Sequence, residues 1–171
     1  GMFAFGVWDS REKQLFLARD RMGIKPVLYA IRNGRFVFAS EIKAILESGI
    51  IKPIINPQAL LDFFATGSVC QPHSFLKDVH FLPAGHFLIY KPGCEPKMHR
   101  YWNIAEHARN LQYEYRKLNY TELVAITRNK LEESTRYHLV SDVPVGSFLS
   151  GGTDSSAITA LMMRYSGYPI K

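Results

Sequence analysis

A loop of small, polar residues near the carboxyl end of the sequence has the composition of an anion-binding site. It consists of Ser150, Gly151, Gly152, Thr153, Asp154, Ser155 and Ser156. Because glycine lacks a Cβ atom, the backbone at Gly151 and Gly152 can approach a bound polyphosphate closely. The serine hydroxyls can donate hydrogen bonds to the same ligand. At the start of a helix, free amides and the helix dipole would add to the attraction for negative charge.

One acid in the loop narrows the choice of anion. Asp154 would repel a bare phosphate, and the sequence has no Gly-Lys pair of the kind that neutralises phosphates in a Walker-type loop. The carboxylate becomes useful if a divalent cation bridges it to the phosphates. We therefore expect a magnesium-bound polyphosphate, held by its pyrophosphate end, and such a site suits the adenylation of a carboxylate. A turn that merely caps a helix explains the loop composition equally well.

The segments on either side are expected to position the loop at the edge of an open parallel sheet. Residues 147–149 form a short apolar run that predicts a buried strand. After the loop, apolar residues recur at helical spacing from Ala157 to Tyr165, which predicts a helix. Strand, glycine turn and helix in this order would aim the helix start at the ligand.

A second helix is predicted upstream, from Thr121, which we expect to be its cap. Arg128, Glu132 and Arg136 are spaced four residues apart, so neighbouring pairs can form ion pairs on its surface. His138 falls on the apolar side of this helix, where a buried and hydrogen-bonded imidazole is the usual arrangement.

A longer pattern surrounds the loop. It reads Ser141-Asp142-Val143-Pro144-Val145-Gly146, then Phe148-Leu149-Ser150-Gly151-Gly152, then Asp154-Ser155-Ser156. This pattern resembles the pyrophosphate loop of glutamine-hydrolysing asparagine synthetases. That family usually has an aliphatic residue where Thr153 stands, and relatives that aminate other carboxylates share the loop. The resemblance implies that residues 149–156 bind ATP and its pyrophosphate, with Leu149 beside the nucleotide and Asp154 holding Mg²⁺.

The rest of the chain resembles the later half of a class II glutamine amidotransferase domain. The similar segments are residues 1–9 and 18–26, Phe38-Ala39-Ser40-Glu41-Ile42-Lys43-Ala44, Leu82-Pro83-Ala84-Gly85-His86 and Arg100-Tyr101-Trp102. The resemblance implies an α/β fold: the C-terminal part of an N-terminal-nucleophile-type αββα sandwich, then the first strand and helix of an open parallel-sheet PP-loop domain. We place the amidotransferase part at residues 1–104, a polar and poorly periodic linker at 105–120, and the start of the synthetase domain at 121–171.

In this family the glutaminase nucleophile is a cysteine at the mature amino terminus, and neither it nor an Asn-Gly-Glu segment occurs here. We therefore assign no catalytic residue and expect an internal segment of a larger enzyme, without glutaminase activity by itself. A tag remnant and start methionine at Gly1-Met2 is the alternative explanation of the first residues.

By the resemblance, the complete enzyme would make asparagine from aspartate with glutamine as nitrogen donor. ATP and Mg²⁺ would support an acyl-adenylate route that releases AMP and pyrophosphate. One alternative is a related enzyme that aminates another carboxylate, on a sugar or a natural-product precursor, which Thr153 weakly favours. The other is a degenerate domain kept for nucleotide binding or protein contacts. The expected partners are glutamine, aspartate and ATP, and a homo-oligomer is left open.

Composition excludes several other classes of function. The 171 residues are 47% hydrophobic and 21% charged, as in an ordinary globular protein. The net charge of +6 is scattered among acids without a basic run, so we expect no nucleic-acid partner. No uncharged run approaches the roughly 20 residues of a membrane span. Cys70 and Cys94 lack metal or redox spacing, which fits reduced thiols and a cytoplasmic protein.

The first hundred residues predict strands and hairpins with few helices. Strands are expected at 3–8, 14–18, 27–31, 35–38, 79–82 and 86–90, with weaker alternation at 100–102. Asn33-Gly34 predicts a two-residue hairpin turn. Helices are expected at 41–47, capped by Ser40, and at 57–64, capped by Asn56.

Two further sets of residues have types that could do chemistry. Arg19, Asp20 and Lys25 crowd one turn, and pairing of their charges across a bend is a better explanation than catalysis. The six histidines include no i, i+4 pair with an accompanying acid, so no zinc site is predicted.

Overall fold

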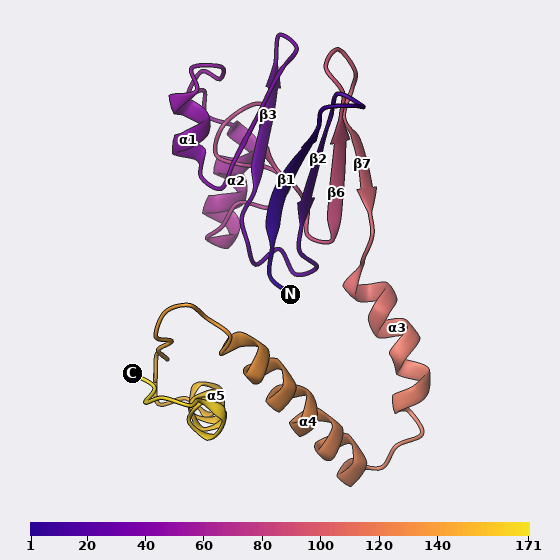
Figure 1. Ribbon diagram of the computed structural model, residues 1–171, viewed down its shortest axis with the longest axis vertical. Coiled ribbons are helices and arrows are strands. Elements are labelled where there is room, and N and C mark those ends of the chain that lie inside the picture. The colour runs from indigo at the N-terminus through magenta and orange to yellow at the C-terminus, as the bar shows by residue number, and fades with distance from the viewer. The chain divides into compact units, whose positions relative to one another are not determined.

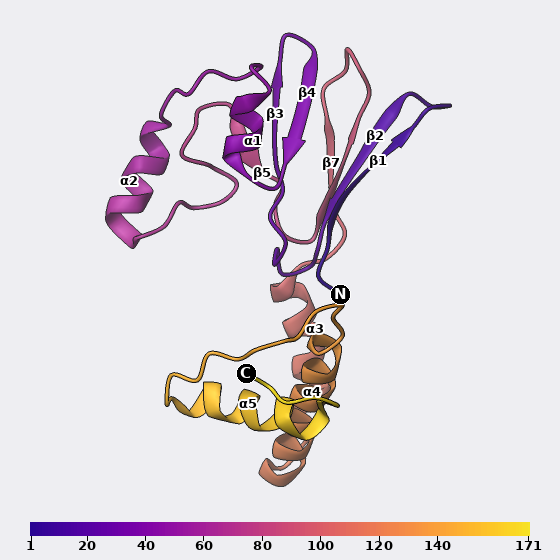
Figure 2. The same cartoon turned by 60° about the vertical axis from the view of Figure 1, so that its left-hand side comes forward.

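The computed structural model describes residues 1–171 and is shown in Figures 1 and 2. The chain divides into two compact units, Gly1–His107 and Ala108–Lys171. The division falls inside helix α3 (Ile104–Tyr115), in the segment that we expected to be an irregular linker.

Two antiparallel sheets form the first unit (Figure 1). One sheet, here sheet A, has the order β1-β2-β6-β7, with strands at Ala4–Asp9, Gln14–Arg19, His86–Tyr90 and Lys97–Arg100. The other, sheet B, has the order β4-β3-β5, with strands at Arg35–Ala39, Leu28–Arg32 and Val79–Phe81. Helices α1 (Ile42–Glu47) and α2 (Pro57–Thr66) follow β4 in the chain. The strands expected at 3–8, 14–18, 27–31, 35–38, 79–82 and 86–90 are therefore confirmed within one residue at each end. The weaker expectation at 100–102 is corrected, because the last strand ends at Arg100.

The main core lies between the two sheets. Its buried members come from sheet A and from the segments that flank sheet B: Leu15, Leu17, Val27, Leu82, Leu88 and Tyr90. A second cluster fills the space between the opposite face of sheet B and α1, where Leu28, Ala30 and Val79 pack against Ile45. The layers are thus sheet, sheet and helix. A helical layer over the remaining face of sheet A, as a full αββα sandwich requires, stays a prediction.

Local chemistry explains the turns and most helix ends. Asn33 and Gly34 have φ values of +51° and +71°, as the β3–β4 hairpin turn requires. Helix α2 begins as expected, with the Asn56 side chain accepting a hydrogen bond from the Gln58 amide at 3.1 Å. The predicted Ser40 cap of α1 is wrong: Glu41 occupies the cap position and makes no side-chain capping bond.

A buried pair of opposite charges sits where β2 ends. Arg19 is 3% exposed and Asp20 is 1% exposed. The Arg19 guanidinium donates to the backbone carbonyls of Gly23, Lys25 and Leu82 at 2.7–2.9 Å, and to the Gln71 side chain at 2.8 Å. Our expectation that these charges and Lys25 pair with one another across the bend is corrected, because the guanidinium bonds to backbone carbonyls instead.

The Asp20 carboxylate is satisfied in the same way, by amides. It accepts from Phe3 at 3.3 Å, Met22 at 3.1 Å, Ile24 at 3.0 Å and Lys25 at 2.9 Å. Burial acts to raise the pKa of Asp20, but the four amides outweigh it, and the net pKa is lowered. The turn after β2 is thus built around one ionised carboxylate.

The second unit consists of the end of α3, helix α4 (Tyr120–His138), helix α5 (Thr153–Tyr165) and the segment that joins them. Helix α4 starts with a capping box. The Asn119 side chain accepts from the Glu122 amide at 3.0 Å, and the Glu122 carboxylate accepts from the Asn119 amide at 2.8 Å. The cap is therefore Asn119, and the expected Thr121 cap is wrong. None of the helices in the chain is both long and apolar enough to cross a lipid bilayer.

Replacing Asp20 should destabilise the first unit. We expect Asp20→Asn to lower the free energy of unfolding by about 3 kcal/mol at neutral pH, because breaking a buried ionic arrangement leaves its partners unsatisfied. Since the folded-state pKa lies below the ordinary value, this contribution is present above the ordinary carboxyl pKa and is lost as pH falls through the folded pKa.

Urea unfolding followed by tryptophan fluorescence measures this, because both tryptophans, Trp8 and Trp102, lie in the first unit. Asp9→Asn is the matched control, since the Asp9 carboxylate accepts two amides in an exposed turn, and it should cost about 1 kcal/mol or less. Equal losses in the two variants, or a difference that persists unchanged into acid, would contradict the assignment.

Candidate anion-binding loop

The segment before the loop does not form a strand. Residues 144–150 carry no regular secondary structure, Phe148 is fully exposed and Leu149 is 62% exposed. The predicted buried strand at 147–149 is therefore wrong for this chain. A strand needs neighbours to complete its backbone hydrogen bonds, and a parallel neighbour would have to come from a distant segment.

Instead, contacts with α5 and with the last residue hold this segment. The Ser147 hydroxyl and the Thr159 hydroxyl are 2.8 Å apart, and the Ser147 amide donates to the Lys171 carbonyl at 2.8 Å. Sequence reasoning missed both side chains. The only available signal was that Thr159 lies one helical turn after Ser155, on the same face.

The loop turns sharply into the start of α5. Gly151 has a φ of +80°, a conformation that glycine adopts without strain. A Cβ atom at this position would have nothing within 4 Å, so the requirement for glycine comes from the backbone angle and not from crowding. The next residue, Gly152, is the N-cap of α5, with φ −76° and ψ 158°.

The start of α5 has no side-chain cap. The first amide that bonds back into the helix is that of Ser156, which donates to the Gly152 carbonyl at 3.1 Å. The three preceding amides, of Thr153, Asp154 and Ser155, are the free donors that every helix start leaves. They are available to a ligand because no residue of the loop covers them with a capping side chain.

Two loop hydroxyls hold the loop in shape. The hydroxyls of Ser150 and Ser155 are 3.0 Å apart, and the Ser155 hydroxyl donates to the Gly152 carbonyl at 3.1 Å. Ser155 is half-buried, whereas Ser150 and Ser156 are exposed. The structure thus brings Ser150 and Ser155 together beside the free amides.

Asp154 lies in the first turn of α5 with an exposed side chain. The chain contains no group of three His, Cys, Asp or Glu side chains able to surround a metal ion. One carboxylate at a helix start nevertheless fits Mg²⁺, which usually keeps several waters and is bound through one or two carboxylates and the phosphates of a substrate. The residues present therefore fit a magnesium–polyphosphate ligand.

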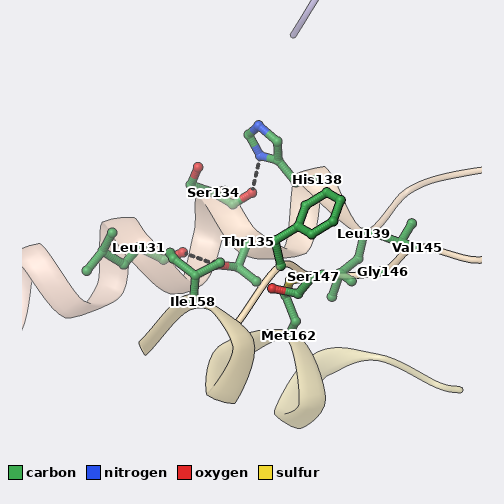
Figure 3. Close-up of a pocket in the computed structure, with 11 residues that line it drawn as sticks. Leu131, Ser134, Thr135, His138, Leu139, Val145, Gly146, Ser147, Ile158 and Met162 are labelled. Carbon is green, nitrogen blue, oxygen red and sulfur yellow. Dashed lines mark hydrogen bonds between the residues drawn. The ribbon is translucent and has the colours of Figure 1, made fainter. Parts of the chain in front are cut away.

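A cavity of about 510 Å³ lies between α4, the segment before the loop and α5 (Figure 3). Figure 3 shows Thr135 of α4 opposite Ile158 and Met162 of α5. The Thr135 hydroxyl donates its proton to the Leu131 carbonyl at 2.8 Å, so that proton is not available to a ligand. His138 is exposed, with its Nδ1 atom 2.8 Å from the Ser134 carbonyl, so the expected buried imidazole is wrong.

One acid joins the two long helices. Glu132 accepts a hydrogen bond from the Tyr165 hydroxyl and lies 3.6 Å from the Arg164 guanidinium. The guanidinium of Arg136 stacks over the Tyr165 ring, 4.1 Å from its centre. The ion pairs of Glu132 with Arg128 and Arg136 that its spacing predicted do not form, because Glu132 instead contacts Tyr165 and Arg164 of α5.

Two models of known protein families match the chain. Residues 1–102 match the model of the glutamine amidotransferase domain, and residues 127–171 match that of asparagine synthase. The chain belongs to the glutamine-hydrolysing asparagine synthetase family.

Similar proteins align with almost the whole chain. Asparagine synthetase [glutamine-hydrolyzing] 3 of Bacillus subtilis is 39% identical over 163 residues, which are 94% of this chain and 25% of that protein. Amidase chyE of Penicillium rubens is 35% identical, over 95% of this chain and 23% of that protein. Putative asparagine synthetase [glutamine-hydrolyzing] 2 of Methanocaldococcus jannaschii is 34% identical, over 96% of this chain and 31% of that protein. The chain thus spans about a quarter to a third of the length of these relatives.

Substitutions at the two loop glycines should have different effects, because Gly151 needs a left-handed backbone conformation whereas Gly152 occupies the N-cap of α5. Gly151→Ser forces a side chain into the left-handed conformation and should destabilise the second unit by about 1 kcal/mol. Gly152→Ser places a preferred capping residue at an N-cap with suitable angles, where its Cβ would meet the nearest atom at 3.5 Å, so stability should be unchanged or rise by a few tenths of a kcal/mol.

Thermal unfolding followed by the helical circular dichroism signal compares the two variants. A Gly152→Ser protein less stable than Gly151→Ser would contradict the described loop geometry.

Proposed function

We propose that the chain is part of an ATP-dependent amidotransferase, in which residues 149–156 bind the pyrophosphate end of ATP during adenylation of a carboxylate. The observation that carries this proposal is the uncapped start of α5, where free amides, a glycine turn and an exposed acid converge. The asparagine synthase match over residues 127–171 supports it, because the loop lies inside the matched region.

In this proposal each loop residue has a physical task. The amides of Thr153, Asp154 and Ser155, with the dipole of α5, stabilise the negative charge that develops on the leaving pyrophosphate. The exposed Ser156 hydroxyl donates to its oxygens, and the Ser150 hydroxyl does the same when it exchanges its bond to Ser155 for one to the ligand. Leu149 offers an exposed apolar surface to the nucleotide.

Asp154 is the residue that would hold Mg²⁺ together with the phosphates. When bound, the ion would neutralise phosphate charge and orient the α-phosphate for attack. Without it, the Asp154 carboxylate would oppose the binding of the nucleotide. The proposal therefore includes a metal requirement that depends on this one side chain.

For the reaction as a whole, we propose that glutamine is hydrolysed to glutamate and ammonia, and that aspartate reacts with ATP to form an acyl-adenylate with release of pyrophosphate. The ammonia then displaces AMP from the adenylate and gives asparagine. The names of the asparagine synthetase relatives support aspartate as the acceptor. We assign the glutaminase chemistry to no residue of this chain.

A second acceptor class is favoured by a specific observation. Two similar proteins, amidase chyE of Penicillium rubens and amidase chry2 of Gibberella zeae, are named as amidases and not as asparagine synthetases, yet are 35% and 33% identical over 95% of the chain. Residues 149–156 would serve either acceptor, because the loop handles only the ATP side of the reaction. The alternative proposal is therefore an enzyme that aminates another carboxylate by the same adenylation.

The loop assignment is tested by the binding of MgATP and of magnesium pyrophosphate to the chain, measured by calorimetry. Asp154→Asn should abolish the dependence on Mg²⁺. Gly152→Ser should weaken binding about tenfold, since a capping hydroxyl would occupy amides that the phosphates need, although the same variant leaves the fold intact. Glu114→Gln, an exposed acid outside the loop, is the matched control and should bind as the parent chain does. Unchanged affinity and unchanged Mg²⁺ dependence in both loop variants would refute the assignment.

The acceptor is tested in the complete enzyme by exchange of labelled pyrophosphate into ATP. Exchange that requires aspartate supports asparagine synthesis, and exchange that requires another carboxylate supports the alternative. No exchange with any acceptor would favour a degenerate domain, the third possibility.

A further inference from the structure

Two histidines that are distant in the sequence face each other at the edge of sheet B. His73 and His80 form an antiparallel bridge. The Phe81 amide donates to the Pro72 carbonyl at 2.8 Å, which fixes the same pairing from the neighbouring residues. Because side chains that lie directly opposite across an antiparallel pair project to the same face, with Cβ atoms about 5 Å apart, the two imidazoles share one face.

The backbone on both sides of this pair is held firmly. His80 belongs to β5 and pairs with Tyr29 of β3, with ring centres 5.8 Å apart. His73 precedes Ser74, which is 1% exposed and whose hydroxyl bonds to the amide and carbonyl of Leu76 at 3.1 Å. Neither histidine depends on a flexible loop for its position.

Both rings are only half-buried, and neither makes a hydrogen bond to a protein atom. The two histidines whose rings do bond within the chain, His86 and His138, use backbone carbonyls as partners. The ring nitrogens of His73 and His80 therefore remain free for a ligand that approaches from solvent. Imidazole nitrogen is a preferred donor for Zn²⁺, Ni²⁺ and Cu²⁺.

We propose that His73 and His80 form a two-histidine site for a divalent transition-metal ion at the edge of sheet B. No third His, Cys, Asp or Glu side chain completes the coordination. Water would occupy the remaining positions, so the bound ion is exchangeable and open to small ligands, unlike the closed shell of a structural zinc site. The site lies within the first unit and is separate from the proposed nucleotide loop.

This site has no sequence signature. The two histidines are seven residues apart and come from an irregular segment and a strand, so the i, i+4 pattern of a helical metal site does not apply. Only the pairing of residues 72–73 with β5 brings them together.

The test is calorimetric titration of the full chain with Ni²⁺ at slightly alkaline pH, because a metal ion binds a deprotonated ring nitrogen. The parent chain should bind one ion. His73→Gln and His80→Gln should each weaken binding by about tenfold or more, because even the loss of a group outside the ligand shell costs that much. His99→Gln is the matched control, since the exposed His99 ring stacks on Phe87 and faces no second histidine across its strand pair.

Circular dichroism and tryptophan fluorescence show whether each variant is folded. His73 lies outside the regular strands, so His73→Gln keeps the test decisive if His80→Gln fails to fold. Unchanged Ni²⁺ affinity in a folded His73→Gln or His80→Gln chain would overturn the proposal. An equal loss of affinity in His99→Gln would also overturn it.

Discussion

Two adjacent buried charges set the geometry of the first unit. Arg19 and Asp20 are almost completely removed from solvent, and a charge in that position is tolerated only with dense hydrogen bonding. The two side chains do not hydrogen-bond to each other. The guanidinium donates hydrogen bonds to backbone carbonyls, and the carboxylate accepts hydrogen bonds from backbone amides. The backbone around the end of β2 therefore surrounds both side chains.

These hydrogen bonds connect segments of the chain that are not paired with each other as strands. The Asp20 carboxylate binds the amide of Phe3, just before β1, and the Arg19 guanidinium binds the carbonyl of Leu82, just after β5. The Tyr101 hydroxyl donates to the Arg19 carbonyl at 2.7 Å. The two side chains thus hold the ends of both sheets, and the backbone of Arg19 holds the segment after β7. These contacts give the crowding of charges in this turn a structural explanation.

Neighbouring residues decide some features of this chain, and contacts with distant residues decide others. The Asn33-Gly34 turn, the Asn56 cap and the helix after the loop were predictable because neighbouring residues decide them. The strand predicted at 147–149 is wrong because a strand requires neighbouring strands. Helix α3 was not predicted because it has few apolar residues and buries none of its side chains. Glu132 shows the same limit, since its spacing predicted partners within α4 whereas α5 supplied them.

The loop residues were predictable as a group, but their arrangement was not. Composition indicated glycines, hydroxyls and an acid, whereas the missing cap of α5 becomes visible only when the backbone is followed to Gly152. This absence is informative because serine, threonine or aspartate at an N-cap commonly stabilises a helix. A glycine there gives up stability that a one-residue change could provide, and natural sequences accept such a loss where function needs the exposed groups.

Asp154 could be explained without any ligand, because an acid in the first turn of a helix interacts favourably with the helix dipole by roughly 0.3–1 kcal/mol. That account leaves the rest of the loop unexplained. A helix selected only for stability would combine the acid with a capping side chain, whereas α5 has the acid, an uncapped start and a left-handed glycine together. An exposed carboxylate beside free amides attracts cations and anions at the same place, and a metal-bound polyphosphate is the ligand class that satisfies both.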